Sequence, residues 1–164
     1  MDKSKPILVT GATGYIAGWI IERLFNQGYN VHATVRAPSK KNKIQHLYDL
    51  ADKSSRQIQF FKADLLESGS FDEAMQGCEI VIHTASPFVV TNYKDAVKDI
   101  IEPAVKGTEN VLDSVNRTES VKRVVLTSSI ASTYGDAVEI QNTANNEFDE
   151  SHWNNTSSET HQPY

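Results

Sequence analysis

The sequence predicts an α/β fold in which a doubly wound parallel sheet is covered by helices on both faces. Short apolar runs rich in β-branched residues alternate with longer segments that have the periodicity of amphipathic helices. The connections between them are short, so successive strands are expected to run parallel with right-handed crossovers. A third observation is a glycine-rich stretch at residues 9–20, directly after the first apolar run. Glycine is unfavourable inside strands and helices, which indicates that a bare backbone is needed there.

The apolar pattern places each element in turn. Five strands, in the spatial order 3-2-1-4-5, are expected at residues 6–10, 31–35, 58–62, 79–83 and 123–127. Helices are expected at residues 15–26, 41–51, 70–76 and 94–116. Residues 134–164 are polar and have no clear period, so they are expected to form a loop.

Several residues are expected to shape the helix ends. Gly28 should cap the first helix at its C-terminus, and Ser70 with Glu73 has the spacing of a capping box at the start of the third helix. Pro103 should interrupt or kink the last helix, whose buried side is expected to include Val105.

Composition excludes several classes of protein. The chain has 164 residues and a net charge of −5, which argues against nucleic acid as a partner. Its single cysteine, Cys78, excludes a disulfide framework and a multi-cysteine metal site, and is expected to be a packed thiol. The start of the chain has no signal-peptide core and no run is long enough to span a membrane, so a cytoplasmic location is expected.

The glycines have the context of a dinucleotide-binding fingerprint. Gly11, Gly14 and Ala17 follow the first strand and open the first helix, and either Ala17 or the next residue, Gly18, is small enough to let the helix lie close to the sheet. Gly11 allows a tight turn, and Gly14 lets the backbone approach a pyrophosphate at the positive helix N-terminus. Thr10 and Thr13 are expected to add hydroxyls to this loop. The alternative is a glycine-rich turn that serves close packing alone.

The end of the second strand distinguishes NADP from NAD. Enzymes that use NAD commonly carry an acidic residue there to hold the ribose 2′-hydroxyl. Residues 33–38 contain no acid but include Arg36, which can pair with a 2′-phosphate, and Lys43 can reach the same group. We therefore expect NADP(H) as the cofactor. The alternative is a solvated helix start with ordinary surface lysines.

Other candidate site residues follow the third, fourth and fifth strands. Asp64 either accepts a hydrogen bond from the adenine amino group or simply forms a turn, and His83 is expected to be a packed histidine rather than a catalyst. The small residues at 84–86 leave room for a ribose and nicotinamide at the switch point of the sheet. Hydroxyls at residues 127–129 face the same crevice, or else form a turn.

Together, these residues resemble the extended short-chain dehydrogenase/reductases, and within them the branch of dihydroflavonol 4-reductases, cinnamoyl-CoA reductases and carbonyl reductases. The resemblance is carried by the motifs at residues 9–16, 32–36, 62–65, 70–74, 83–87 and 127–129, with Asp149, Glu150 and Trp153 in addition. It implies a Rossmann-type fold and the reduction of an aldehyde or ketone with NADPH. The cofactor contacts that it implies are Gly11, Thr13, Gly14, Tyr15, Ile16, Arg36, Lys43, Asp64, Leu65, Thr84, Ala85, Ser86, Thr127 and Tyr164.

The resemblance also implies the catalytic groups. Ser129 orients the substrate carbonyl, and Tyr164 donates a proton with the help of a lysine four residues later, which would lower the tyrosine pKa. Tyr164 is the last residue, so we expect a truncated enzyme: a cofactor-binding domain at 1–133, a loop at 134–164, and no substrate domain. Such a piece should be inactive alone and expose apolar surface around its fifth strand. The alternatives are a non-catalytic NADP-binding module and a nucleotide-sugar epimerase or dehydratase.

Overall fold

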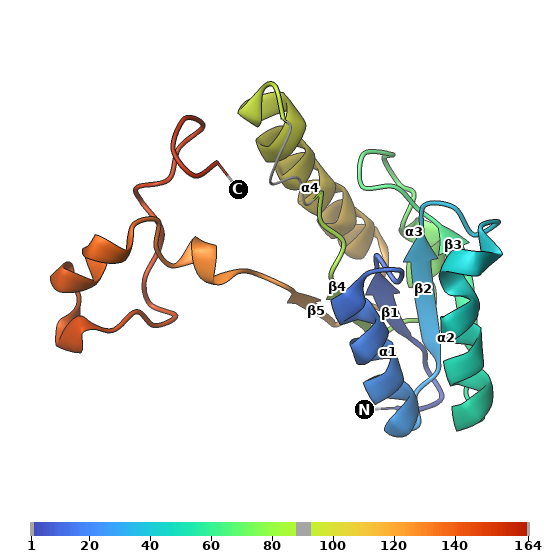
Figure 1. Cartoon of the computed structure of the whole chain (residues 1–164). Helices are drawn as coiled ribbons and strands as arrows, with labels where there is room; N and C mark the ends of the chain where they lie inside the picture. The colour runs from blue at the N-terminus through green and yellow to red at the C-terminus, as the bar shows by residue number, and fades with distance from the viewer. Residues whose placement is uncertain (1, 88–92, 164) are drawn as a thin grey trace. The chain divides into compact units, whose positions relative to one another are not determined.

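The computed structural model describes residues 2–87 and 93–163 (Figure 1). The chain divides into two compact units, one formed by residues 1–86 with 106–127 and the other by residues 87–105 with 128–164. Each unit is described by itself below. No helix in the described residues combines the length and apolar character needed to cross a bilayer.

The first unit is built on a parallel sheet of five strands. These are β1 (Ile7–Thr10), β2 (Val31–Val35), β3 (Ile58–Lys62), β4 (Ile80–His83) and β5 (Arg123–Leu126). Their spatial order is β3-β2-β1-β4-β5, with every neighbouring pair parallel, which confirms the predicted topology. The direction of strand order reverses between β1 and β4, so the carboxyl ends of these two strands form the switch point of the sheet.

Two hydrophobic cores lie on opposite faces of the sheet. Ile7 and Val9 of β1 belong to the core beneath α1 (Tyr15–Asn26) and α2 (Lys41–Ser54), while Leu8 between them belongs to the core beneath α3 (Asp72–Met75) and α4 (Glu102–Arg117). All four residues of β1 are buried, as expected for a strand covered on both faces.

The first helix ends as the sequence predicts. Gly28 has a φ of +91°, a conformation that side chains disfavour. Its N–H donates to the carbonyl of Phe25, and the N–H of Tyr29 donates to the carbonyl of Leu24. This pair of hydrogen bonds is the Schellman motif that closes a helix before the next strand.

The predicted capping box at Ser70 is wrong. Helix α3 begins only at Asp72, and the Ser70 hydroxyl turns back to the loop after β3. There it donates to the carbonyl of Asp64 over 2.7 Å and accepts from the Asp64 N–H over 3.2 Å. The hydroxyl is thus directed to a backbone segment six residues earlier, and the N-cap position of α3 is Phe71 rather than Ser70.

The fourth helical segment shows the expected disturbance at Pro103. Residues Val97–Ile101 are π-helical, and α4 follows them. Proline has no N–H and its ring crowds the carbonyl four residues before it, which favours a widened turn at this point. Val105 was expected to be buried but is 50% exposed. Gly107 packs against Leu65. Positions two residues apart in a helix face roughly opposite directions, so Val105 faces away from this contact.

The edge strand β5 carries exposed apolar side chains. Among the described residues it pairs with β4 alone, and Val125 and Leu126 are 47% and 53% exposed. This confirms the expected open apolar surface around the fifth strand.

The loop that the sequence predicts at residues 134–164 is present as far as residue 163, and residues 128–133 continue it toward β5. Residues 128–163 contain three short 3₁₀ turns, at Ile130–Ser132, Ala137–Asn142 and Ala144–Asn146, and none of these residues is buried. Tyr134 stacks on Phe148 with ring centroids 4.5 Å apart. Hydrogen bonds therefore carry most of the order of this segment.

Candidate functional site

The backbone between β1 and α1 forms an open cradle for an anion. Gly14 is the N-cap residue of α1. It has no side chain that could accept hydrogen bonds from the first turn, and that turn contains no acidic residue. The N–H groups of a first helical turn have no partner inside the helix, and together they carry a partial positive charge. With Gly14 in place of a capping side chain, these N–H groups are open to a phosphate group.

Gly11 is required by both its conformation and its neighbour. Its φ is +65°, and a Cβ placed on it would lie 2.9 Å from the Cα of Ala85. Ala85 follows β4, so the two chain segments that leave β1 and β4 approach each other closely at this point. A side chain at position 11 would push apart the two segments that flank the switch point.

The hydroxyl of Thr10 joins the same two strand ends. Its oxygen accepts from the N–H groups of Thr84 and Ala85, each over 3.1 Å, and lies 2.7 Å from Nδ1 of His83. Two accepted bonds leave the hydroxyl one hydrogen to donate, so Nδ1 of His83 is the acceptor and carries no proton. The hydroxyl of Thr84 returns a hydrogen bond to the carbonyl of Thr10 over 2.6 Å.

This geometry corrects the expectation for Thr10. Its side chain is fully buried against β4 and does not face the glycine loop, whereas Thr13 is exposed there as expected. His83 is the packed histidine that the sequence predicts, since it is buried and burial lowers its pKa. Cys78 is likewise a packed thiol, with its pKa raised to about 12 by burial.

The first turns of α1 separate packing residues from exposed ones. Ala17 is buried against the sheet, while a Cβ on Gly18 would meet no atom within 4 Å. Ala17 alone therefore provides the close approach of helix and sheet that either residue was expected to provide. Tyr15 and Ile16, the implied cofactor contacts, are 82% and 56% exposed beside the cradle.

The two basic candidates are available to an anionic ligand. Arg36 directly follows β2 and Lys43 lies in the first turn of α2, and both are exposed. Neither side chain forms an ion pair or hydrogen bond in the described residues. No acidic residue stands at the end of β2, where the ribose 2′-hydroxyl would need one.

Asp64 and Leu65 have structural roles of their own. One carboxylate oxygen of Asp64 accepts from the N–H of Leu66 over 3.0 Å, which forms the turn considered as the alternative. Its second oxygen has no partner in the described residues. Leu65 packs against α4, where a Cβ on Gly107 would lie 3.0 Å from its Cβ.

The remaining candidates lie after β4 and β5. Ser86 is exposed, and the N–H of Thr127 donates to the carbonyl of His83 over 2.9 Å, which continues the pairing of the two strands. Ser129 belongs to the second unit and caps the turn Ile130–Ser132 by accepting from the Ala131 N–H. Tyr164 lies outside the described residues.

Sequence reasoning missed Thr34 and the partners of Thr10. Thr34 accepts the Ala12 N–H at its backbone carbonyl over 3.0 Å and the Gly11 N–H at its hydroxyl over 3.4 Å, and thereby ties the glycine loop to β2. Thr10 joins β1 to β4. Both are hydroxyl residues inside apolar strands, and a hydroxyl that is buried needs a hydrogen-bond partner. The hydroxyl residues within apolar strands could be recognised in the sequence, but their hydrogen-bond partners could not.

Comparison with known proteins identifies the class. The model of the NAD-dependent epimerase/dehydratase family matches residues 7–162, and the chain belongs to this family. Within it, the chain is similar to plant and yeast reductases. It is 53% identical to a cinnamoyl-CoA reductase of Medicago truncatula over 125 residues, which cover 76% of this chain and 38% of that protein.

Two further comparisons point to the same branch. A putative anthocyanidin reductase of Ginkgo biloba is 46% identical, with 90% of this chain and 42% of that protein covered. The crystal structure of Gre2 from Candida albicans in complex with NADPH superposes with a TM-score of 0.75 at 31% identity, covering 93% of this chain and 45% of that chain. The chain thus spans about two fifths of the length of the curated relatives that it matches.

We expect Gly11→Ala and Gly18→Ala to have opposite effects on stability. Gly11→Ala forces a side chain into a left-handed conformation and against Ala85, and should destabilise the fold by about 1–2 kcal/mol or more. Gly18→Ala adds a helix-favouring residue where there is open space, and should stabilise by up to about 1 kcal/mol. Urea unfolding measures both, and equal effects of the two substitutions would contradict the close approach at position 11.

We expect His83 to make the stability depend on pH. Its pKa is lowered in the folded protein, so between that value and the unfolded value the unfolded chain binds more protons, and stability falls as the pH falls. The loss should not exceed about 1.4 kcal/mol per pH unit below about pH 6.5. Unfolding measured between about pH 7.5 and 5.5 should show a weaker dependence in His83→Asn, while His46→Asn on the exposed face of α2 should behave as the unsubstituted chain does.

Proposed function

We propose that this chain is the cofactor-binding part of an NADPH-dependent reductase that converts an aldehyde or ketone to an alcohol. The observation that carries the proposal is the combination at the end of the sheet: a bare glycine cradle at an open helix N-terminus, with Arg36 where an acid would select NAD. The similarity to reductases, one of them solved with NADPH, supports it.

Each part of NADPH can be assigned to residues at the carboxyl ends of the strands. The pyrophosphate would lie on the N–H groups between Gly11 and Ile16, where Gly14 leaves the backbone uncovered. The free oxygen of Asp64 would accept from the adenine amino group. Small residues at 84–86, with Thr127, leave room at the switch point for the ribose and nicotinamide.

Two basic side chains favour the 2′-phosphate of NADP over the 2′-hydroxyl of NAD. A guanidinium binds a phosphate dianion through paired, charge-assisted hydrogen bonds, and Lys43 adds a second positive charge. Both groups are exposed and without partners in the described residues, so no ion pair has to break when the phosphate binds.

The chemistry itself divides between cofactor and protein. NADPH, when bound, supplies a hydride to the carbonyl carbon. The Tyr164 hydroxyl would donate the proton to the carbonyl oxygen, and Ser129 would hold that oxygen by a hydrogen bond. A tyrosine has a pKa near 10 and needs a nearby cation to act near neutral pH. We place that cation, a lysine four residues after Tyr164, in the complete protein together with a substrate domain, beyond the domain at 1–133 and the loop at 134–164.

We expect Arg36→Ala to weaken NADPH binding by about 10- to 100-fold and to leave NADH binding unchanged, because the lost contact is to the 2′-phosphate. Lys43→Ala should act in the same direction with a smaller effect. Calorimetric titration of the chain with each cofactor measures this. Arg23→Ala and Lys53→Ala, which remove exposed charges at the far ends of α1 and α2, serve as matched controls. Equal affinities for the two cofactors in the unsubstituted chain would contradict the assignment of NADP.

We expect the complete protein to oxidise NADPH in the presence of a suitable aldehyde, and the 164-residue chain to bind NADPH without turnover. The reason is that the lysine proposed to lower the pKa of Tyr164 would stand four residues after it and is not among these 164 residues. Absorbance at the reduced nicotinamide band follows both reactions. Turnover by the chain alone would overturn the role given to the lysine, and binding without turnover in the complete protein would favour a non-catalytic NADP-binding module.

A further inference from the structure

The loop between the two proposed catalytic residues is held by three polar links. Asn154 donates from its side chain to the carbonyl of Ala131 over 2.8 Å and from its backbone to that of Ser132 over 2.8 Å. Glu139 accepts from the Thr156 hydroxyl, and Asp136 accepts from His161 and Gln162. Each link joins positions at least 17 residues apart in the sequence.

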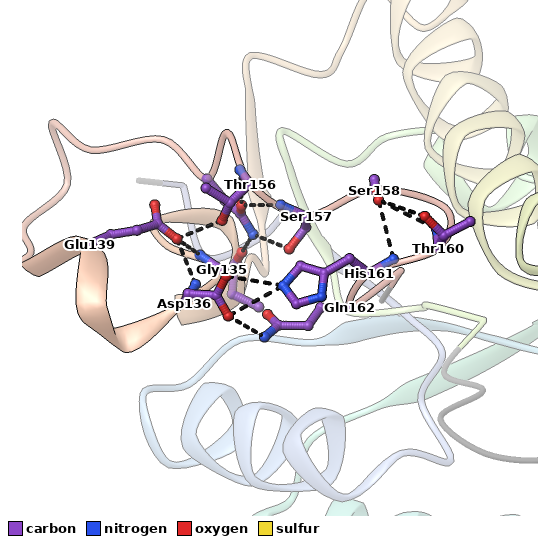
Figure 2. A network of polar contacts seen from close by, with 11 residues as sticks. Gly135, Asp136, Glu139, Thr156, Ser157, Ser158, Thr160, His161 and Gln162 are labelled. Carbon is purple, nitrogen blue, oxygen red and sulfur yellow. Dashed lines mark hydrogen bonds and ion pairs between the residues drawn. The ribbon is translucent and has the colours of Figure 1, made fainter.

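Figure 2 shows how the two carboxylates bring the ends of this loop together. One oxygen of Glu139 accepts from the backbone N–H groups of Gly135 and Asp136, over 3.1 and 2.6 Å, and also takes the Thr156 hydroxyl. The carboxylate of Asp136 lies 3.0 Å from Nε2 of His161. A carboxylate can only accept, so Nε2 of His161 carries the hydrogen.

Gly135 makes this packing possible. A Cβ placed on it would lie 2.3 Å from the Thr156 hydroxyl oxygen and 3.0 Å from the side-chain oxygen of Asn154. The side chains of residues 154–157 therefore lie directly against the backbone at Gly135, where there is no room for a side chain. No side chain of residues 128–163 is buried, so polar contacts of this kind must supply order that an apolar core supplies elsewhere.

The links touch both ends of the segment between the proposed catalytic residues. Ser129 caps the turn Ile130–Ser132, and the last carbonyls of that turn are the ones that Asn154 holds. At the other end, the partners of Asp136 precede Tyr164 by three and two residues. Hydrogen bonds thus cross-link residues 131–162, the described segment between Ser129 and Tyr164, which reduces the entropy cost of ordering it.

We propose that Asp136 is a positioning residue of the reductase: by holding His161 and Gln162 against the turn at residues 135–139, its carboxylate fixes the segment that leads directly into Tyr164. This inference rests on the proposed function. Asp136 touches neither cofactor nor substrate in it, and acts through the segment that precedes the tyrosine. Rate depends steeply on such placement, because an error of about 1 Å can cost about 100-fold.

The test compares Asp136→Asn with Glu147→Gln in the complete protein. Asp136→Asn removes the charge and one of two acceptor oxygens, whereas Glu147 lies on the same loop, is exposed, and has no side-chain partner in the described residues. We expect Asp136→Asn to lower kcat by about 10- to 100-fold with a much smaller change in the KM for NADPH, since every proposed cofactor contact except Tyr164 belongs to the other unit. Glu147→Gln should leave both constants unchanged.

Two further readouts separate positioning from loss of folded protein. A misplaced proton donor slows the chemical step, so the isotope effect on kcat with deuterated NADPH should rise in Asp136→Asn, whereas a smaller folded fraction would leave it unchanged. Gln162→Ala should lower kcat in the same direction, and adding it to Asp136→Asn should change kcat little, because both act through one contact. Gln162→Ala also carries the test if Asp136→Asn does not fold.

The outcomes are distinct. Unchanged kcat and isotope effect in Asp136→Asn, or in Gln162→Ala should the first variant not fold, overturns the positioning role and leaves the reductase proposal standing. Independent, additive losses in the two variants overturn it as well. Complete protein that binds NADPH but reduces no aldehyde or ketone refutes the proposed function, and the positioning role with it.

Discussion

The approach of the backbone after β1 to the backbone after β4 is the constraint on which the cofactor end of the sheet depends. A Cβ on Gly11 would lie only 2.9 Å from the Cα of Ala85, and the buried hydroxyl of Thr10 bonds to Thr84, Ala85 and His83. A parallel sheet opens a crevice where its strand order reverses, and these contacts define how wide that crevice is. The cradle proposed for the pyrophosphate and the space proposed for the nicotinamide therefore depend on the same contact between these two segments.

Charge is distributed unevenly around this site. The chain is acidic overall, and some of its basic side chains form ion pairs, as Lys5 does with Glu79 and Arg117 with Asp72. The guanidinium of Arg117 holds the pKa of Asp72 below its usual range. Arg36, by contrast, has no partner in the part of the chain that the structure describes. A cation that is left open in an acidic protein, beside a cradle for phosphates, is placed for an anionic ligand.

The two units are held together internally by different forces. The sheet unit has an apolar core on each face, so its order follows from burial, which is non-directional and tolerant of small changes. The loop unit has no buried side chain from 128 to 163 and depends on directional hydrogen bonds from Asp136, Glu139 and Asn154. The order of the segment between Ser129 and Tyr164 therefore rests on individual contacts, each of which a single substitution can remove.

The sequence by itself determined the strand order, the glycine cradle, the helix cap at Gly28 and the packed state of His83, because periodicity and backbone conformation are local properties that neighbouring residues specify. Only the tertiary structure decided what each hydroxyl and carboxylate bonds to. Ser70 has the spacing of a helix cap yet bonds to the loop after β3, and Thr10 turns from the cradle to β4. The links of Asp136 could not be read from the sequence for the same reason: a hydrogen bond between residues 25 positions apart exists only once the chain has folded to bring them together.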